Sequence, residues 1–387
     1  MTSLSYSPFV QSVRASVRPF VYFLRPSTNA LPSPMQITAV SFITRFAPRV
    51  LPMLALCGAA MVSACAASRD DSAQPAQAGK LVGDSPAGAH ELTIRVLDVG
   101  QGDATLIENG GSRVLIDGGP DEHRMGELLD SLDLNGQIFD VVILTHQHAD
   151  HLVGLRALFE KKRHITVRYF FENQDPYTAA NLRHLRDSIN ARVARGELIY
   201  RDTDDPCANG KPICVITLKG GAKLDIMRPF GGSKNPNDRS APVKIVGPDS
   251  AAFTMWLAGD AEQDAVRWFL GDAGYAKNPG MHVTVLKADH HGSCNGMTDE
   301  YLAALKPQFA TASLGDINSY HHMHEQAKAE LRLHHIPWYR TDQNGTITIR
   351  ASGVAGGKPV ITVQKGTKDM SGDSDARSTQ SECNPIR

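Results

Sequence analysis

The sequence predicts an α/β fold, an α+β sandwich of β-sheets covered by helices. Three observations support this prediction. Short apolar and β-branched runs separated by Gly-rich turns open the folded part, a continuous apolar run follows at 141–144, and strands then alternate with helices up to residue 350. With 387 residues, 42% of them apolar, the chain can bury the core that such a fold needs.

The first strands are expected at 92–97, 104–108 and 113–116, as an antiparallel meander. The apolar run Val141–Leu144 predicts a strand that is buried on both faces. Apolar periodicity predicts the remaining elements. Helices are expected at 122–132, 152–162, 179–195, 261–270, 298–305 and 324–334, and strands at 167–171, 213–218, 223–227, 252–258, 282–287, 309–314, 337–340 and 345–350.

The N-terminal 64 residues have the composition of an export leader. Arg45 and Arg49 precede the apolar run Val50–Val62, which is too short to span a bilayer comfortably. Val62-Ser63-Ala64-Cys65 resembles the bacterial lipobox, in which the cysteine thiol receives the lipid. We therefore expect a lipoprotein anchored through Cys65 at the periplasmic face of a bacterial membrane. A secreted protein with an ordinary cleaved signal and a retained anchor helix are the alternatives.

Three further segments follow the leader. Residues 65–89 are small and polar and are expected to be a flexible tether, 90–366 the folded domain, and 367–387 a flexible tail. The leader holds five arginines and no acidic residue, so 35 basic and 41 acidic residues remain, a net charge of about −6. The folded part therefore lacks the global positive charge of unspecific nucleic-acid binders. Local clusters at 156–168 and 183–195 offer either a phosphate-tracking surface or solvated helix faces.

The cysteines after position 65 suggest disulfides, because the leader indicates an oxidising compartment. Cys207 and Cys214 flank a turn-rich segment and are expected to pair. Cys294 would then pair with Cys383 by elimination. A free Cys294 thiol close to His291 is the alternative.

The most informative segment is Thr145–His151, which follows the predicted buried strand and precedes a helix. Alternate spacing points His146, His148 and Asp150 to one side, and His151 turns toward a second ion. Imidazole and carboxylate ligands suit zinc or a similar first-row ion. The segment therefore predicts a two-metal site on a rigid strand end.

This segment matches His-x-His-x-Asp-His, the signature of the metallo-β-lactamase superfamily. Over residues 92–350 the chain most resembles the soluble hydrolase domain of ComEC-type DNA-uptake proteins. One departure is His148, where ComEC-type members usually carry aspartate, which makes the site more similar to a standard two-zinc hydrolase. Further matching stretches are Leu97–Ala104 (LDVGQGDA), Leu115–Gly119 (LIDGG), Leu257–Asp260 (LAGD), Leu286–Ser293 (LKADHHGS) and Asn318–Tyr320 with His322.

The resemblance implies an αββα fold and specific roles for several residues. Asp260 would bridge two metal ions, and His290 or His291 would complete the second ion's ligands. Asp150 would be both ligand and catalytic residue, and His322 would act on the leaving group or bind phosphate. Asp117 would hold a ligating imidazole from outside the ligand set, or simply cap a turn, whereas Asp98, Gln101 and Asp103 would shape the loop beneath the site.

A third histidine for the first ion is missing from the expected place. Between His151 and Asp260 the only histidines are His164, after a basic run, and His184, on a predicted amphipathic helix. Neither follows a predicted strand, so we expect an incomplete first site that water fills.

The resemblance implies an exported hydrolase that uses a metal-bound hydroxide on phosphodiesters in nucleic acid, cell wall or lipid head groups. Two zinc ions are expected, with manganese or iron as alternatives. The expected partners are a phosphate-containing substrate, which nucleic acid could supply, and the membrane; no protein partner is indicated. A β-lactamase or other ester or lactone hydrolase of the same fold, and a non-catalytic binding lipoprotein, are the competing hypotheses.

Overall fold

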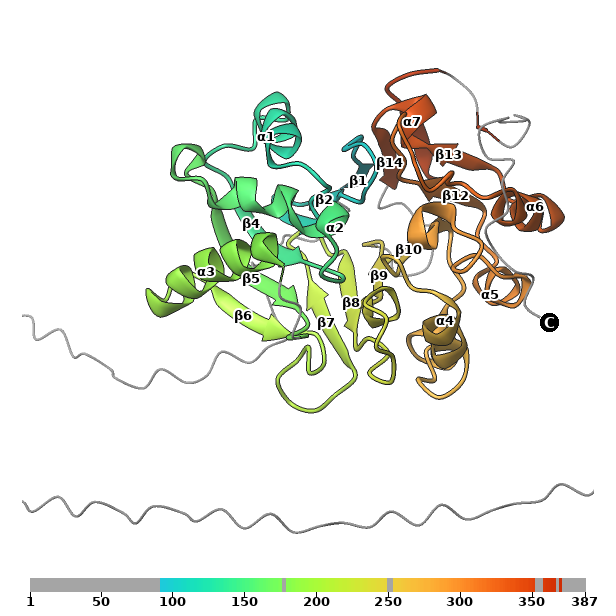
Figure 1. Ribbon diagram of the computed structural model, residues 1–387, viewed down its shortest axis with the longest axis horizontal. Helices are drawn as coiled ribbons and strands as arrows, with labels where there is room; N and C mark the ends of the chain where they lie inside the picture. Colours follow the sequence, from blue (N-terminus) through green and yellow to red (C-terminus); the bar gives the residue numbers. More distant parts are fainter. Residues whose placement is uncertain (1–90, 176–178, 249–252, 352–357, 367–368, 371–387) are drawn as a thin grey trace, which may run out of the picture. The chain divides into compact units, whose positions relative to one another are not determined.

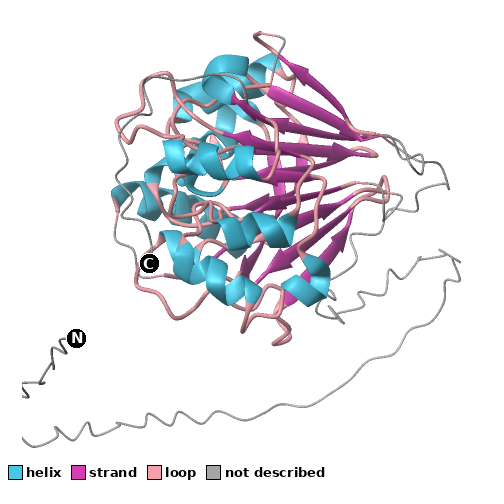
Figure 2. Ribbon diagram, turned by 90° about the vertical axis from the view of Figure 1, so that its right-hand side faces the viewer, coloured by secondary structure: helices cyan, strands magenta, loops and turns pink. Residues whose placement is uncertain are grey.

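The computed structural model describes residues 91–175, 179–248, 253–351, 358–366 and 369–370. Within this part, two β-sheets lie face to face between two groups of helices, α1 to α3 on one side and α4 to α6 on the other (Figure 1). Seen from the side, the helices gather toward one end of the strands (Figure 2). The arrangement is the four-layered αββα sandwich that the sequence predicts.

The first sheet has the order β15-β14-β1-β2-β3-β4-β5-β6 among the described residues. Its strands run antiparallel from β15 to β3 and parallel from β3 to β6. The bounds are β1 Leu92–Val96, β2 Thr105–Asn109, β3 Ser112–Ile116, β4 Ile138–Ile143, β5 Thr166–Glu172, β6 Ile199–Asp202, β14 Ile347–Ala351 and β15 Val360–Val363.

The second sheet has the order β13-β12-β11-β10-β9-β8-β7 in the described part of the chain. Strands β10 to β13 are parallel to one another, and β7 to β10 are antiparallel. The bounds are β7 Ile213–Thr217, β8 Lys223–Met227, β9 Val243–Val246, β10 Thr254–Leu257, β11 Val285–Lys287, β12 Phe309–Ala312 and β13 Trp338–Arg340.

The helices supply the outer layers. They are α1 Glu122–Ser131, α2 Ala149–Leu152, α3 Ala180–Ala194, α4 Gln263–Leu270, α5 Asp299–Leu305, α6 Glu325–Leu333 and the short α7 Thr341–Asn344. None of the helices within the described ranges is long and apolar enough to cross a membrane.

Three apolar clusters fill the three interfaces of the sandwich. One lies between the sheets, and the others lie between each sheet and its own helices. Strand β4 shows how the pattern arises, because successive side chains point to opposite faces. Val141 and Ile143 face the second sheet, whereas Val142 and Leu144 face the helices. A continuous apolar run is therefore what this position requires.

Several elements differ from the sequence-based expectation. The predicted helix at 152–162 is α2 followed by two 3₁₀ segments, Gly154–Phe159 and Lys161–Arg163. At Gly154 the backbone packs so closely against the Gly118 carbonyl that a Cβ atom would lie 1.8 Å from its oxygen. Strands β6, β9 and β15 were not expected. Each is four residues long.

Candidate metal centre

The segment His146–His151 lies at the C-terminal end of β4, where the strand passes into α2 (Figure 1). His146 and His151 are fully buried, whereas His148 and Asp150 are partly exposed. The side chain of Gln147 points elsewhere and donates a 2.8 Å hydrogen bond to the Asn173 carbonyl oxygen after β5. Alternation along the chain thus sends the histidines and the amide to different surroundings.

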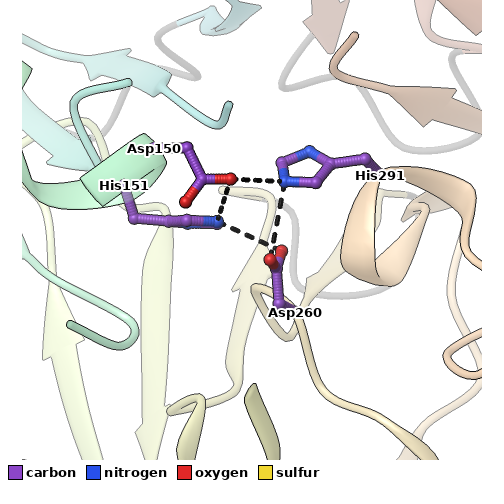
Figure 3. Close-up of side chains that lie close together, drawn as sticks. All are labelled: Asp150, His151, Asp260 and His291. Carbon is purple, nitrogen blue, oxygen red and sulfur yellow. Dashed lines mark hydrogen bonds and ion pairs between the residues drawn. The ribbon is translucent and has the colours of Figure 1, made fainter. Parts of the chain in front are cut away.

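The structure brings the predicted ligands together in two groups, each with one ligand atom per residue and all atoms within 4.8 Å of one another. His146, His148 and Asp260 form the first group. Asp150, His151, Asp260 and His291 form the second, and their side chains converge from three elements (Figure 3). Asp260 belongs to both groups, so its carboxylate lies where one residue can contact two ions.

The turn after β10 places Asp260 between the two groups. Gly259 adopts a left-handed φ of 55°, and a Cβ atom on it would lie 2.6 Å from Thr145 Oγ1. The Asp260 amide donates to Ser240 Oγ at 3.1 Å. The carboxylate is 2% exposed, and although burial acts to raise its pKa, His151, His291 and His290 hold that pKa well below its usual value.

The structure distinguishes His291 from His290. Both lie in the turn Asp289–Gly292, each with a left-handed φ. His291 Nε2 lies 3.2 Å from Asp150 Oδ2 and 3.5 Å from Asp260 Oδ2, inside the second group. His290 belongs to neither group. Its Nδ1 lies 3.2 Å from Glu262 Oε1 and its Nε2 lies 3.9 Å from Asp260 Oδ2. His291 is therefore the ligand candidate.

Asp117 contacts His151, one of the four residues of the second group. Its carboxylate accepts hydrogen bonds of 2.8 Å from the backbone and the hydroxyl of Thr145, and it lies 2.9 Å from His151 Nδ1. This contact directs the His151 Nε2 atom toward Asp260, 3.1 Å away. Burial lowers the pKa of His151, but the carboxylates of Asp260, Asp117 and Asp150 together raise it well above its usual value.

Of the two aspartates expected beneath the site, Asp98 lies beside Lys365, with its carboxylate 3.5 Å from Nζ. Asp103 lies beneath the site, as expected. It is 3.4 Å from His291 Nδ1 and 2.9 Å from the buried Lys287 Nζ. The sequence does not separate the two because both aspartates flank the same Gly-rich loop.

A cavity of about 530 Å³ opens above the two ligand groups. Gln101, Asn237, Ser293, Asn295, Tyr320, His322 and His324 line it together with the ligand candidates. The His322 ring centroid lies 5.2 Å from that of His290 and 5.9 Å from that of His291. Burial, His291 and His290 lower the pKa of His322 to about 2, so its imidazole is neutral at pH 7.

The other sequence-based expectations have different outcomes. His164 and His184 are both exposed, on the 3₁₀ segment's end and on α3, and neither enters a ligand group. Cys207 and Cys214 are joined by a disulfide. Cys294 is nearly buried, but Cys383 lies outside the described residues, so this pair stays a prediction. Cys65 and the leader also lie outside them.

The local basic clusters do not support a phosphate-tracking surface. Most of their cations lie beside a carboxylate of the same surface, which neutralises them. The ion pairs are Arg156–Glu122, Lys162–Glu160, Arg163–Asp130, Arg168–Asp140, Arg186–Glu172 and Arg195–Glu197.

The ligand groups have the chemistry that divalent cations require. His146 Nε2, His151 Nε2 and Asp260 Oδ1 are buried, and none has a hydrogen-bond partner among the described residues. Buried polar atoms without partners are costly, and a cation between them would remove that cost. The residues therefore fit a metal site made of imidazole nitrogens and carboxylate oxygens.

The comparisons with known proteins agree with this geometry. The family model described as the metallo-β-lactamase superfamily matches residues 97–169. "ComE operon protein 3" of Bacillus subtilis is 26% identical over 287 residues, which cover 68% of this chain and 34% of that protein. "Competence protein ComA" of Neisseria gonorrhoeae is 24% identical over 260 residues, 67% of this chain and 32% of that protein.

The chain is similar to ComEC-like proteins of the metallo-β-lactamase superfamily. Among solved structures it is similar to the metallo-β-lactamase fold protein YhfI from Bacillus subtilis, with 13% identity and a TM-score of 0.44 over 68% of this chain and 100% of YhfI. The matched part of this chain spans about a third of the length of these two relatives.

Two site residues escaped the sequence analysis. Asn237 and Glu262 lie at the cavity's edge, and they contact each other and His290. The available signal was their position, since Asn237 precedes a strand and Glu262 follows Asp260 by two residues.

Proposed function

We propose that the chain is an exported, metal-dependent phosphodiesterase with a two-ion centre of zinc-class metal. The observation that carries this proposal is the shared position of Asp260 in both ligand groups. Two divalent ions in such a site activate water as the nucleophile and neutralise negative charge that develops on a phosphoryl oxygen. The first ion would be held by His146, His148 and Asp260, and the second by Asp150, His151, Asp260 and His291.

The chain's own residues complete the site. Asp117 orients the imidazole of His151, because its carboxylate lies beside the Nδ1 atom opposite the ligating Nε2. The Nδ1 atom of His291 lies 3.0 Å from the Ser313 carbonyl oxygen, with the Asp103 carboxylate 3.4 Å away. His322 is neutral and borders the cavity, so its N–H can donate to a phosphoryl oxygen. Asp150, partly exposed to the cavity, lies where it can also accept a proton from the attacking water.

The choice of phosphodiesters rests on the lining of the cavity and on the relatives. Amide, hydroxyl and imidazole groups of Gln101, Ser293 and His322 supply hydrogen-bond donors for phosphate oxygens. The name of one matched relative, "Competence protein ComA", refers to competence, which is consistent with a nucleic-acid phosphodiester. Cell-wall and lipid phosphodiesters satisfy the same chemistry.

A panel of chromogenic substrates tests the proposal. Full-length protein loaded with zinc or manganese should hydrolyse bis-nitrophenyl phosphate, and Asp260→Ala should abolish this activity. Nitrophenyl phosphocholine would separate lipid or cell-wall head groups from nucleic acid. Hydrolysis of a cephalosporin alone would favour the β-lactamase hypothesis, and inactivity on all three with bound metal would favour a binding protein.

A further inference from the structure

The two ligand groups are unequal. The second group contains four side chains and the first contains three, of which only His146 and His148 are imidazoles. The two other histidines between His151 and Asp260 are exposed and belong to neither group, and His290 belongs to neither group either. If a further protein atom among the described residues completes the first group, it must therefore belong to a side chain other than histidine.

The loop that carries Asn237 is hydrogen-bonded to the segments that follow β4 and β10, which carry the ligands of the site. The Ala241 amide donates to the Thr145 carbonyl oxygen at 3.0 Å, one residue before His146. The Asp260 amide donates to Ser240 Oγ in the same loop. Asn237 itself is 7% exposed and lines the cavity together with His148 and Asp260. The loop is thus fixed relative to the ligands of the first group.

The orientation of the Asn237 amide follows from Glu262. Asn237 Nδ2 donates to Glu262 Oε1 at 2.7 Å, and an ionised carboxylate can only accept hydrogen bonds. The nitrogen must therefore face Glu262. The same nitrogen lies 3.5 Å from His290 Nε2. The opposite atom, Asn237 Oδ1, is buried and has no hydrogen-bond partner in the part of the chain that the structure describes.

We propose that Asn237 Oδ1 is the third side-chain ligand of the first metal ion besides His146 and His148, with Asp260 shared between both ions. This inference rests on the proposed metal centre. Glu262 is then a positioning residue, which holds the amide so that its oxygen is presented. A neutral oxygen in place of an imidazole makes the first site weaker than the second, and shifts its preference from zinc toward manganese.

Metal titration of the full-length protein tests the assignment. Binding of Zn²⁺ and Mn²⁺ would be measured with chelator-buffered metal, with circular dichroism as the check on folding. We expect Asn237→Ala to weaken one of two ions by at least about ten-fold and to leave the other unchanged. His290→Ala is the matched control, because it removes a neighbouring side chain of the same cavity and should leave both affinities unchanged.

A second variant keeps the test decisive if Asn237→Ala does not fold. Asn237→Asp combined with Glu262→Gln reverses the hydrogen bond and presents an anionic oxygen, so one ion should bind several-fold more tightly than in the wild type. Unchanged affinities in both Asn237 variants, or loss of the ion in His290→Ala instead, would overturn the inference. Wild-type protein without two ions would instead overturn the proposed metal centre itself.

Discussion

The Nε2 atom of His151 lies 3.1 Å from Oδ1 of Asp260, and neither atom has a hydrogen-bond partner in the described part of the chain. These two atoms form an ion pair at a spacing that also suits two ligands of one cation. This relationship connects the motif after β4 to the turn after β10, and therefore connects the two sheets at one site.

Removal of His291 should affect one ion only. His291→Ala takes a ligand from the second group and leaves the first intact, so the protein should retain about one ion per chain by elemental analysis. His290→Ala should retain two. If His290→Ala loses an ion and His291→Ala does not, the assignment of these neighbours is reversed.

Replacement of Asp117 should weaken the second ion without unfolding the domain. Asp117→Asn keeps the shape of the side chain but removes the charge beside His151 Nδ1. Loss of such a partner typically reduces metal affinity about 10–100-fold. Equilibrium dialysis against buffered Zn²⁺ would measure the change, and an affinity equal to that of the wild type would refute the orienting role.

Gly259, the residue before Asp260, should tolerate no side chain. Gly259→Ala combines a left-handed backbone with a Cβ atom 2.6 Å from Thr145 Oγ1, so Asp260 should be displaced and hydrolysis lost. Gly196→Ala is the control, because Gly196 has a φ of 70° with nothing within 4 Å. That control should cost only about 1–2 kcal/mol of stability, measured by urea unfolding, and retain turnover. Equal losses of activity in both would contradict the steric explanation.

Cys65 should determine location. Wild-type protein should fractionate with membranes and incorporate a fatty-acid analogue, whereas Cys65→Ser should not be labelled, because the lipobox-like segment then lacks its thiol. Equal labelling of both forms, or of neither, would leave a plain secreted hydrolase.

The sequence predicts the layers and most of the site, because both depend on local patterns. The buried strand β4 and the ligands behind it form one continuous segment, and Asp260 follows a recognisable strand and turn. The choice between His290 and His291 could not be predicted. Both residues occupy the same strained turn, and which imidazole faces Asp150 depends on packing against β12, where the Ser313 carbonyl oxygen lies 3.0 Å from His291 Nδ1.

Asn237 was missed for a related reason. An asparagine in a polar loop is usually a turn residue, and only its burial beside Glu262 distinguishes it. Asp98 and Asp103 show the same limit, because a loop's sequence does not determine which of its carboxylates points inward.

The metal content of full-length protein purified without chelators tests the central claim most directly. We predict about two zinc-class ions per chain in the wild type. Asp260→Ala should lose both stoichiometric metal and phosphodiester hydrolysis, because that carboxylate belongs to both ligand groups. Wild-type protein that hydrolyses bis-nitrophenyl phosphate without stoichiometric metal, or an Asp260→Ala variant that retains both ions, would contradict it.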